Sequence, residues 1–145
     1  MEFSGKFVDY LVDDLSKKEE LKSIKFVVAY ENDIKPTPVT KPIAAVSVKS
    51  SEIGNRLSKT LDNGEIVFTD IRPATLVVSI DLYLPYSLGG NEGHRIFDLI
   101  VTVIAKGHNQ FLSKAVCYDA DYDKNSQAIC VKTLFSFADS LNPKE

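Results

Sequence analysis

The sequence predicts an α+β fold: a mainly antiparallel sheet covered on one face by two helices, with a projecting β-hairpin arm. Residues 75–85 alternate strictly between two faces, which is typical of a strand with one buried face. Residues 3–20 and 91–106 instead place apolar side chains at helical spacing. The β-branched and turn-forming segments between them give the order helix, strand, strand, hairpin, strand, helix, strand, strand.

The central unit is a strand followed by a glycine turn and a helix. In the strand, the residues expected on the buried face are Leu76, Val78, Ile80, Leu82 and Leu84. Pro85 lacks an amide hydrogen and should end the strand, and Gly89 and Gly90 permit a turn. Asn91 is the predicted N-cap of the helix. The apolar stripe of this helix consists of Ile96, Phe97, Leu99, Ile100, Val103 and Ile104.

Further strands are predicted where β-branched and aromatic residues concentrate, at 24–30, 43–50, 111–118 and 128–137. An extended loop at 32–41, with two prolines, separates the first two strands. A polar turn at 119–127 joins the last two. The chain, 1–145, is expected to form one domain of ordinary size that ends in a flexible tail at 139–145.

Residues 51–73 are predicted to form the hairpin arm. The tripeptide Asp62-Asn63-Gly64 is a strong hairpin-turn signal, and residues 65–69 would form the return strand. The segment is mostly polar and has little apolar content to bury by itself. Two interpretations remain open: an arm that projects from the domain, or a surface hairpin packed on its own sheet.

Composition and charge narrow the classes of partner. Hydrophobic residues make up 44% and charged residues 26% of the chain, as in typical globular proteins. The net charge of −3 and the dispersed basic residues argue against nucleic-acid binding by charge, and we expect no sequence-specific nucleic-acid partner. No apolar run approaches the roughly 20 residues that span a bilayer, and the acidic N-terminal segment is unlike a signal peptide. We therefore expect folding in a cytoplasm and no membrane partner.

The acidic run near residue 120 is a candidate metal site by residue type. Asp119, Asp121 and Asp123 have the carboxylate spacing of an EF-hand loop, but Lys124 and Cys130 stand where that loop needs Gly and Glu. A solvated acidic hairpin turn is the favoured interpretation. We predict no metal site and no cofactor.

Cys117 and Cys130 flank this turn. In a regular hairpin centred between Asp123 and Lys124 they would face each other across the ladder. Two cysteines in a chain of this length do not make a disulfide framework. In a reducing cytoplasm both should remain free thiols, packed in or near the core.

No catalytic constellation is visible. His94 would be a general base by residue type alone, because no G-x-S-x-G or comparable frame supplies a nucleophile. A histidine on the surface of the first helical turn is the favoured interpretation. Gly89-Gly90 ahead of a helix suggests anion binding, yet both known glycine-rich phosphate patterns are absent, and loop geometry explains the two glycines.

The stretch TLVVSIDLYLPYSLGGNEGHRIFDLIVTVI, residues 75–104, resembles small tail proteins of Gram-positive prophages and of phage-derived contractile particles. Its features are the strand end Tyr83-Leu84-Pro85-Tyr86, the two glycines and the apolar helix. The segments KPIAAVSVKSSEIG and YDADYD…QAICVKTLFSF fit the same pattern. The order of elements is similar to that of the tail terminator proteins.

This resemblance implies a structural virion protein without catalysis. Such proteins form a ring, usually a hexamer, at the head-proximal end of the tail tube. The ring stops polymerisation of tube and sheath and meets the neck, collar or head–tail connector. The resemblance therefore implies self-association, tube and sheath partners, and a place in a virion tail or phage-tail-like particle assembled in a bacterial cytoplasm.

A ring of this kind requires head-to-tail contacts between subunits. Two surfaces are predicted to make them, the arm and the polar face of the sheet, with the residues Arg56, Lys59, Asp62, Asn63, Glu65, Asp81 and Tyr83. Another neck, head-completion or baseplate component is the alternative within the same class. A stand-alone ligand-binding or regulatory domain is the alternative from a different class, and an enzyme ranks third.

Overall fold

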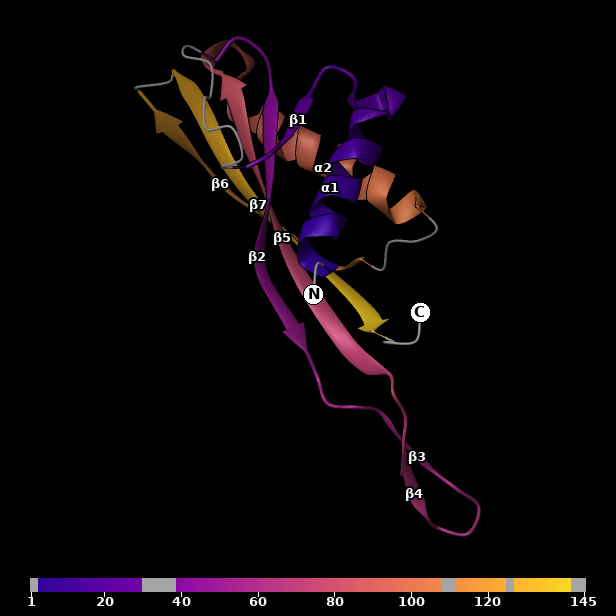
Figure 1. Ribbon diagram of the computed structural model, residues 1–145. Coiled ribbons are helices and arrows are strands. Elements are labelled where there is room, and N and C mark those ends of the chain that lie inside the picture. The colour runs from indigo at the N-terminus through magenta and orange to yellow at the C-terminus, as the bar shows by residue number, and fades with distance from the viewer. Residues whose placement is uncertain (1–2, 30–38, 108–111, 125–126, 142–145) are drawn as a thin grey trace.

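The predicted α+β fold is confirmed in the computed structural model, which describes residues 3–29, 39–107, 112–124 and 127–141. A five-stranded sheet has the strand order β1-β2-β5-β7-β6, and a two-stranded ribbon, β3-β4, extends beyond it. Figure 1 shows both helices on the same face of the sheet and the ribbon pointing away from it.

Two α-helices and two short 3₁₀ turns accompany the strands. They are α1 (Phe3–Ser16), η1 (Glu19–Leu21), η2 (Tyr86–Leu88) and α2 (Asn91–Lys106). The strands are β1 (Lys25–Val28), β2 (Ile43–Ile53), β3 (Ser58–Thr60), β4 (Ile66–Phe68), β5 (Arg72–Pro85), β6 (Leu112–Asp123) and β7 (Ala128–Leu141). Within the described ranges, neither helix is long and apolar enough to cross a membrane.

Strand β5 lies in the middle of the sheet and is paired along its whole length. It runs antiparallel to β7 from Arg72, opposite Leu141, to Pro85, opposite Ala128. It also runs antiparallel to β2, while β1 adds to β2 in parallel at one edge. Strand β6 pairs with β7 and forms the other edge.

The alternation of β5 divides the molecule into a core side and an open side. The even-numbered residues from Leu76 to Leu84 are fully buried, whereas the odd-numbered residues from Val77 to Tyr83 are only partly buried. Leu11 and Leu15 of α1 and Ile100 of α2 belong to the same apolar cluster as the buried face of β5. Both helices therefore use their apolar stripes to cover one side of the sheet.

Two close contacts connect β7 with its neighbours, α2 on one side and β5 on the other. At Gly93, a β-carbon would lie 2.4 Å from Cγ2 of Val131, so α2 approaches β7 more closely than any larger residue allows. Thr133, the one buried polar side chain found in the described part of the chain, donates its hydroxyl to the carbonyl of Ile80 at 2.6 Å. A buried hydroxyl is thereby satisfied within the sheet.

Helix boundaries differ from the sequence prediction at two points. The helix expected at 3–20 ends at Ser16, and η1 follows. Asn91 is not the N-cap of α2: Gly90 takes that position and no side chain caps the helix. The cause is local, because η2 and the positive φ of Gly89 (78°) complete the turn one residue earlier.

The polar turn predicted at 119–127 is wrong. Residues 119–123 belong to β6, and the strands connect through 124–127. A register shift between Cys117 and Ala120 absorbs one extra residue in β6, after which pairing with β7 resumes at Val131 and continues to Asp123 opposite Ala128. Ladder pairing thus keeps these acidic residues extended.

The flexible tail predicted at 139–145 is wrong for residues 139–141, which belong to β7. Strand β7 continues through Leu141 because β5 starts at Arg72 and offers its first residues as ladder partners. Residues 142–145 lie outside the described part of the chain, as do the prolines of the predicted loop and Tyr30 at the end of the first predicted strand.

Replacing Gly93 with Ala is expected to destabilise the fold. Alanine improves helix propensity by about 1 kcal/mol, but its β-carbon collides with the stiff, β-branched Val131 in the centre of the core. We expect a net loss of about 1–3 kcal/mol in the free energy of unfolding, measured by urea denaturation. The double variant G93A/V131A should lose less free energy of unfolding than the two single variants lose together, because removing the Val131 side chain makes room for the new β-carbon. Losses that add strictly would contradict this close contact.

Candidate interaction surfaces

The arm is a continuation of β2 and β5 beyond the sheet. Their pairing extends to Ile53 opposite Ala74, and the amide of Gly54 then donates to the carbonyl of Pro73 at 2.8 Å. A β-carbon on Gly54 would lie 2.9 Å from Pro73 Cγ, so this position requires the absence of a side chain. Strands β3 and β4 then pair to the end of the arm.

The turn at the tip of the arm has the geometry that the sequence signals. Gly64 has φ of 86° and donates its amide to the carbonyl of Leu61 at 2.9 Å. The side-chain oxygen of Asn63 accepts a hydrogen bond from the amide of Glu65 at 2.9 Å. Asn63 therefore has a local structural role as a turn former.

The arm projects into solvent and does not pack on its own sheet. Every residue from Lys49 to Phe68 is exposed except Gly54, which is partly exposed. Figure 1 shows the arm leaving the lower end of the sheet, away from both helices. The projecting arm, one of the two interpretations left open by the sequence, is the one the structure supports.

The expectation that the arm has little apolar content is wrong. Exposed large hydrophobic residues on it are Ile53, Leu57, Leu61, Ile66, Val67 and Phe68. Ile66 and Phe68 are 62% and 60% exposed and, being two residues apart in β4, share one face of the ribbon. The guanidinium of Arg56 lies 5.6 Å from the ring centre of Phe68. These exposed apolar residues make the arm a candidate interaction surface.

The predicted interface residues fall on two separate surfaces. The five charged and polar residues predicted on the arm are all exposed there, and they are Arg56, Lys59, Asp62, Asn63 and Glu65. Asp81 and Tyr83 lie on the open face of the sheet, roughly 30 Å along β5 from the base of the arm at about 3.3 Å per residue. The structure does not bring the two sets together.

The open face of the sheet is mixed and partly buried. Asp81 accepts a hydrogen bond from Ser79 at 3.1 Å and lies opposite Lys132 of β7. Tyr83 packs against a small apolar cluster that includes Val39 and Ile43. This face has fewer exposed apolar groups than the arm, and its role as an interface stays a prediction.

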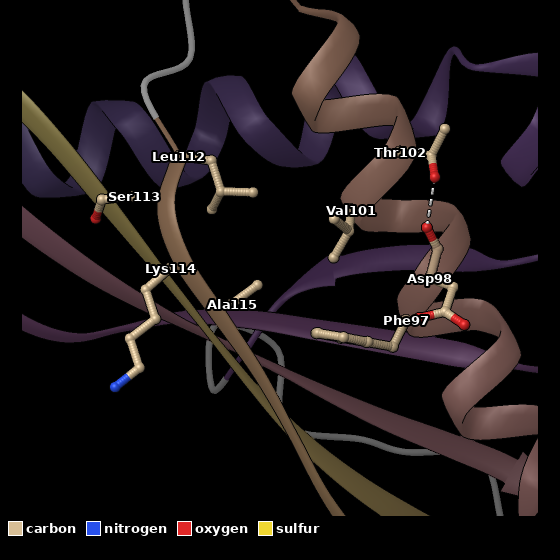
Figure 2. A pocket seen from close by; sticks show the side chains of 8 residues that line it. All are labelled: Phe97, Asp98, Val101, Thr102, Leu112, Ser113, Lys114 and Ala115. Carbon is tan, nitrogen blue, oxygen red and sulfur yellow. Dashed lines mark hydrogen bonds between the residues drawn. The ribbon is translucent and has the colours of Figure 1, made fainter.

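A groove that sequence reasoning missed lies between α2 and the edge strand β6. Its volume is about 530 Å³, and it is lined by Phe97, Asp98, Val101, Thr102, Leu112, Ser113, Lys114 and Ala115. Figure 2 shows the apolar side chains of α2 and β6 pointing toward one another, while Lys114 extends from the strand away from the helix. No single segment signals this groove, since its two walls come from separate elements.

The pKa of the Cys117 thiol is raised by its surroundings, which include two acidic residues. Burial raises the pKa of the Cys117 thiol, and the negative charges of Asp98 and Asp119 raise the pKa further. The thiol is thus held in its neutral, poorly nucleophilic form. This effect locates two negative charges near the middle of β6.

The cysteines do not face each other. Cys117 lies opposite Thr133, and Cys130 lies opposite Asp121 and Tyr83. The prediction of facing cysteines is wrong because the strands connect at 124–127, beyond the assumed centre of the hairpin. Neither cysteine forms a disulfide, and both are partly buried.

The other candidates remain isolated groups. His94 is exposed in the first turn of α2, as expected, and His108 lies outside the described residues. Glu92, in the same turn, has its pKa lowered by a hydrogen bond from Arg95. In the described ranges no three His, Cys, Asp or Glu side chains gather as metal ligands. Asp119, Asp121 and Asp123 are spread along β6 and do not form a loop.

Comparison with known proteins adds no assignment: no protein-family model matches the chain, and a search of curated proteins finds no match.

Deleting residues 56–68 is expected to leave a folded domain and to impair self-association. These residues are exposed and belong to neither apolar cluster, so the free energy of unfolding should change by no more than about 1 kcal/mol. Circular dichroism and thermal melting measure the fold, and light scattering measures the mass. An unfolded deletion variant would contradict the description of the arm as an independent projection.

The double variant C117S/C130S is expected to fold and assemble normally, because neither thiol is in a disulfide and no metal cluster lies near them in the described chain. In C130S, alkylation of Cys117 by iodoacetamide at pH 8 should be slower than that of a free thiol, since the raised pKa leaves less thiolate. Loss of assembly in a folded double variant would indicate a disulfide or metal role instead.

Proposed function

We propose that this chain is a structural subunit of a phage tail or phage-tail-like contractile particle, with the role of a tail terminator. In this role, copies form a ring, usually a hexamer, at the head-proximal end of the tail tube. The ring stops growth of tube and sheath and connects them to the neck or collar. The chain performs no catalysis there and requires no cofactor or metal.

The observation that carries the proposal is the exposed apolar arm. A two-stranded ribbon is at best marginally stable by itself in water, yet this one presents Ile66 and Phe68 largely to solvent. A second chain is the natural source of cover for such a surface. A ring supplies that chain because its head-to-tail contacts repeat one arm contact for every copy.

The fold also supports the proposal. The resemblance implied an N-terminal helix, hairpins, a central strand, a second helix and closing strands, and the described elements follow that order. Another neck, head-completion or baseplate component fits the same fold and the same arm. Such a component would differ from a terminator in the part of the particle to which it binds.

A ligand-binding or regulatory domain is the second candidate, and the groove between α2 and β6 is the observation that favours it. Its volume falls within the roughly 300–1,000 Å³ of small-molecule pockets. Such pockets combine an apolar lining with several convergent polar groups. Here Lys114 extends away from the helix wall (Figure 2), so the polar groups converge poorly.

The first experiment is the native mass of the purified chain, alone and with the tail-tube protein of the same particle, by light scattering and negative-stain microscopy. We expect closed rings, and rings at one end of each tube, with tubes shorter than those grown without the chain. A chain that leaves tube length unchanged and binds no tube end would contradict the terminator role.

A further inference from the structure

We propose that the arm of one copy docks in the groove between α2 and β6 of a second copy, so that copies associate head to tail. The inference deepens the ring role and rests on it only for closure of the contacts into a ring. The proposal makes the arm and the groove, two exposed surfaces of the fold, each other's binding partners.

The two surfaces match in chemistry. The arm presents Ile66 and Phe68 on one face of β4, mostly exposed to water. The groove is lined on its apolar side by Phe97 and Val101 of α2, and by Leu112 and Ala115 of β6. Seating one in the other removes apolar area from water on both sides, which is the main favourable term in protein association.

The arm that fills the groove comes from another molecule. Strands β3 and β4 lie at the far end of the arm, which leaves the sheet in a direction away from α2 (Figure 1). The ladder of β2 and β5, with one irregularity between Val48 and Ser50, extends to Ile53 opposite Ala74, and backbone hydrogen bonds from Gly54 to Pro73 and from Leu57 to Ile71 continue it into the base of the arm. Bending the arm back onto its own groove would have to break these backbone hydrogen bonds.

Charge sets the direction of docking. On the arm, Asp62 and Glu65 lie at the tip, and Arg56 and Lys59 lie nearer the sheet. Between residues 56 and 65 the charge therefore changes from basic to acidic toward the tip, while Glu52 and Asp70 add acidic residues nearer the sheet.

Helix α2 carries charges in the opposite order, from Asp98 in the lining of the groove to Lys106, which is not among the lining residues. Helix α2 runs antiparallel to β6, since Gly90 at its start approaches Ala120 and Tyr122 near the end of β6. Asp98 therefore lies on the same side of the groove as Asp119, the two acids that act together on Cys117. Lys106 is two helical turns beyond Asp98, at the other end.

The spacing of these charges agrees. Eight residues of helix separate Asp98 from Lys106, roughly 12 Å. On the arm, Lys59 lies in β3 and Asp62 lies three residues further along in the tip turn, a separation of at most roughly 10 Å. An arm lying along the groove with its tip toward Lys106 places unlike charges opposite each other at both ends, which fixes orientation more than affinity.

The edge strand supplies main-chain partners in the same place. Strand β6 is the last strand on its side of the sheet, and only Lys114 to Cys117 keep regular register between its two irregularities. Strand β3 has a similar length and, in this orientation, runs antiparallel to β6. An extended segment added to an open sheet edge gains main-chain hydrogen bonds.

A mixing experiment with two defective variants tests the proposal. The arm variant I66S/F68S removes two exposed side chains and should fold normally. The groove variants V101D and T102R place a charged side chain on the α2 side of the groove and should prevent the arm from docking there. T102R changes an exposed residue, so it replaces V101D in the experiment if V101D loses stability. Each variant alone should associate at least about tenfold more weakly than the unmodified chain, by sedimentation equilibrium.

Mixed in equal amounts, an arm variant and a groove variant should form dimers and nothing larger. The arm variant still has an intact groove and the groove variant an intact arm, so one productive contact remains per pair. L88S, which removes an exposed apolar side chain outside the arm, and S87R, which adds an arginine outside the groove, are the matched controls and should leave association unchanged.

Several results would overturn the docking. The first is an unmodified chain that stays monomeric at its highest soluble concentration. The second is association that survives in both variants, or that is lost only in the arm variant. The third is a mixture of the two variants that yields no dimer. An arm variant that still self-associates but no longer binds tube ends also overturns it and assigns the arm to the tube.

The same experiment separates this inference from the proposed function. Closed rings that tolerate both variants support the terminator role and overturn the docking. Open filaments that are lost in both variants, with dimers in the mixture, support the docking and contradict the closed ring.

Discussion

The strict alternation of β5 is the constraint on which the rest of the structure depends. Because successive side chains point to opposite faces, a slip of one residue would expose Leu76 to Leu84 and bury Asp81. The pairing of β5 with β2 and β7 is therefore set by burial, and the helices then occupy the apolar side. The polar side is left open, and the strand continues past the core into the arm.

Much of the fold was predictable, because its strongest signals are local and periodic. The apolar stripe of α2 and the buried face of β5 were identified residue by residue, since helical and alternating periods are carried by neighbouring residues. The Asp119–Asp123 segment was misassigned for the opposite reason. Its composition favours a turn, but pairing with β7 holds it extended, and strand preference depends on such tertiary context.

The interaction surfaces were predictable only in part. The Asp-Asn-Gly signal located the tip of the arm, yet the apolar residues around it were not recognised as exposed, because exposure depends on what the rest of the chain covers. The groove had no signal in the sequence. Its walls, near Val101 and Leu112, meet only because α2 turns back along β6, and Gly93 permits the close approach of α2 to the sheet.

The backbone hydrogen bonds that continue from β2 and β5 into the base of the arm have a geometric consequence. A flexible linker would let the arm reach a neighbour at many angles. Here the irregularity between Val48 and Ser50 and the close contact of Gly54 with Pro73 fix the angle at which the arm leaves the core. If arms join copies, the curvature of the assembly, and with it the number of subunits that closes a circle, is determined inside each monomer before any two copies meet.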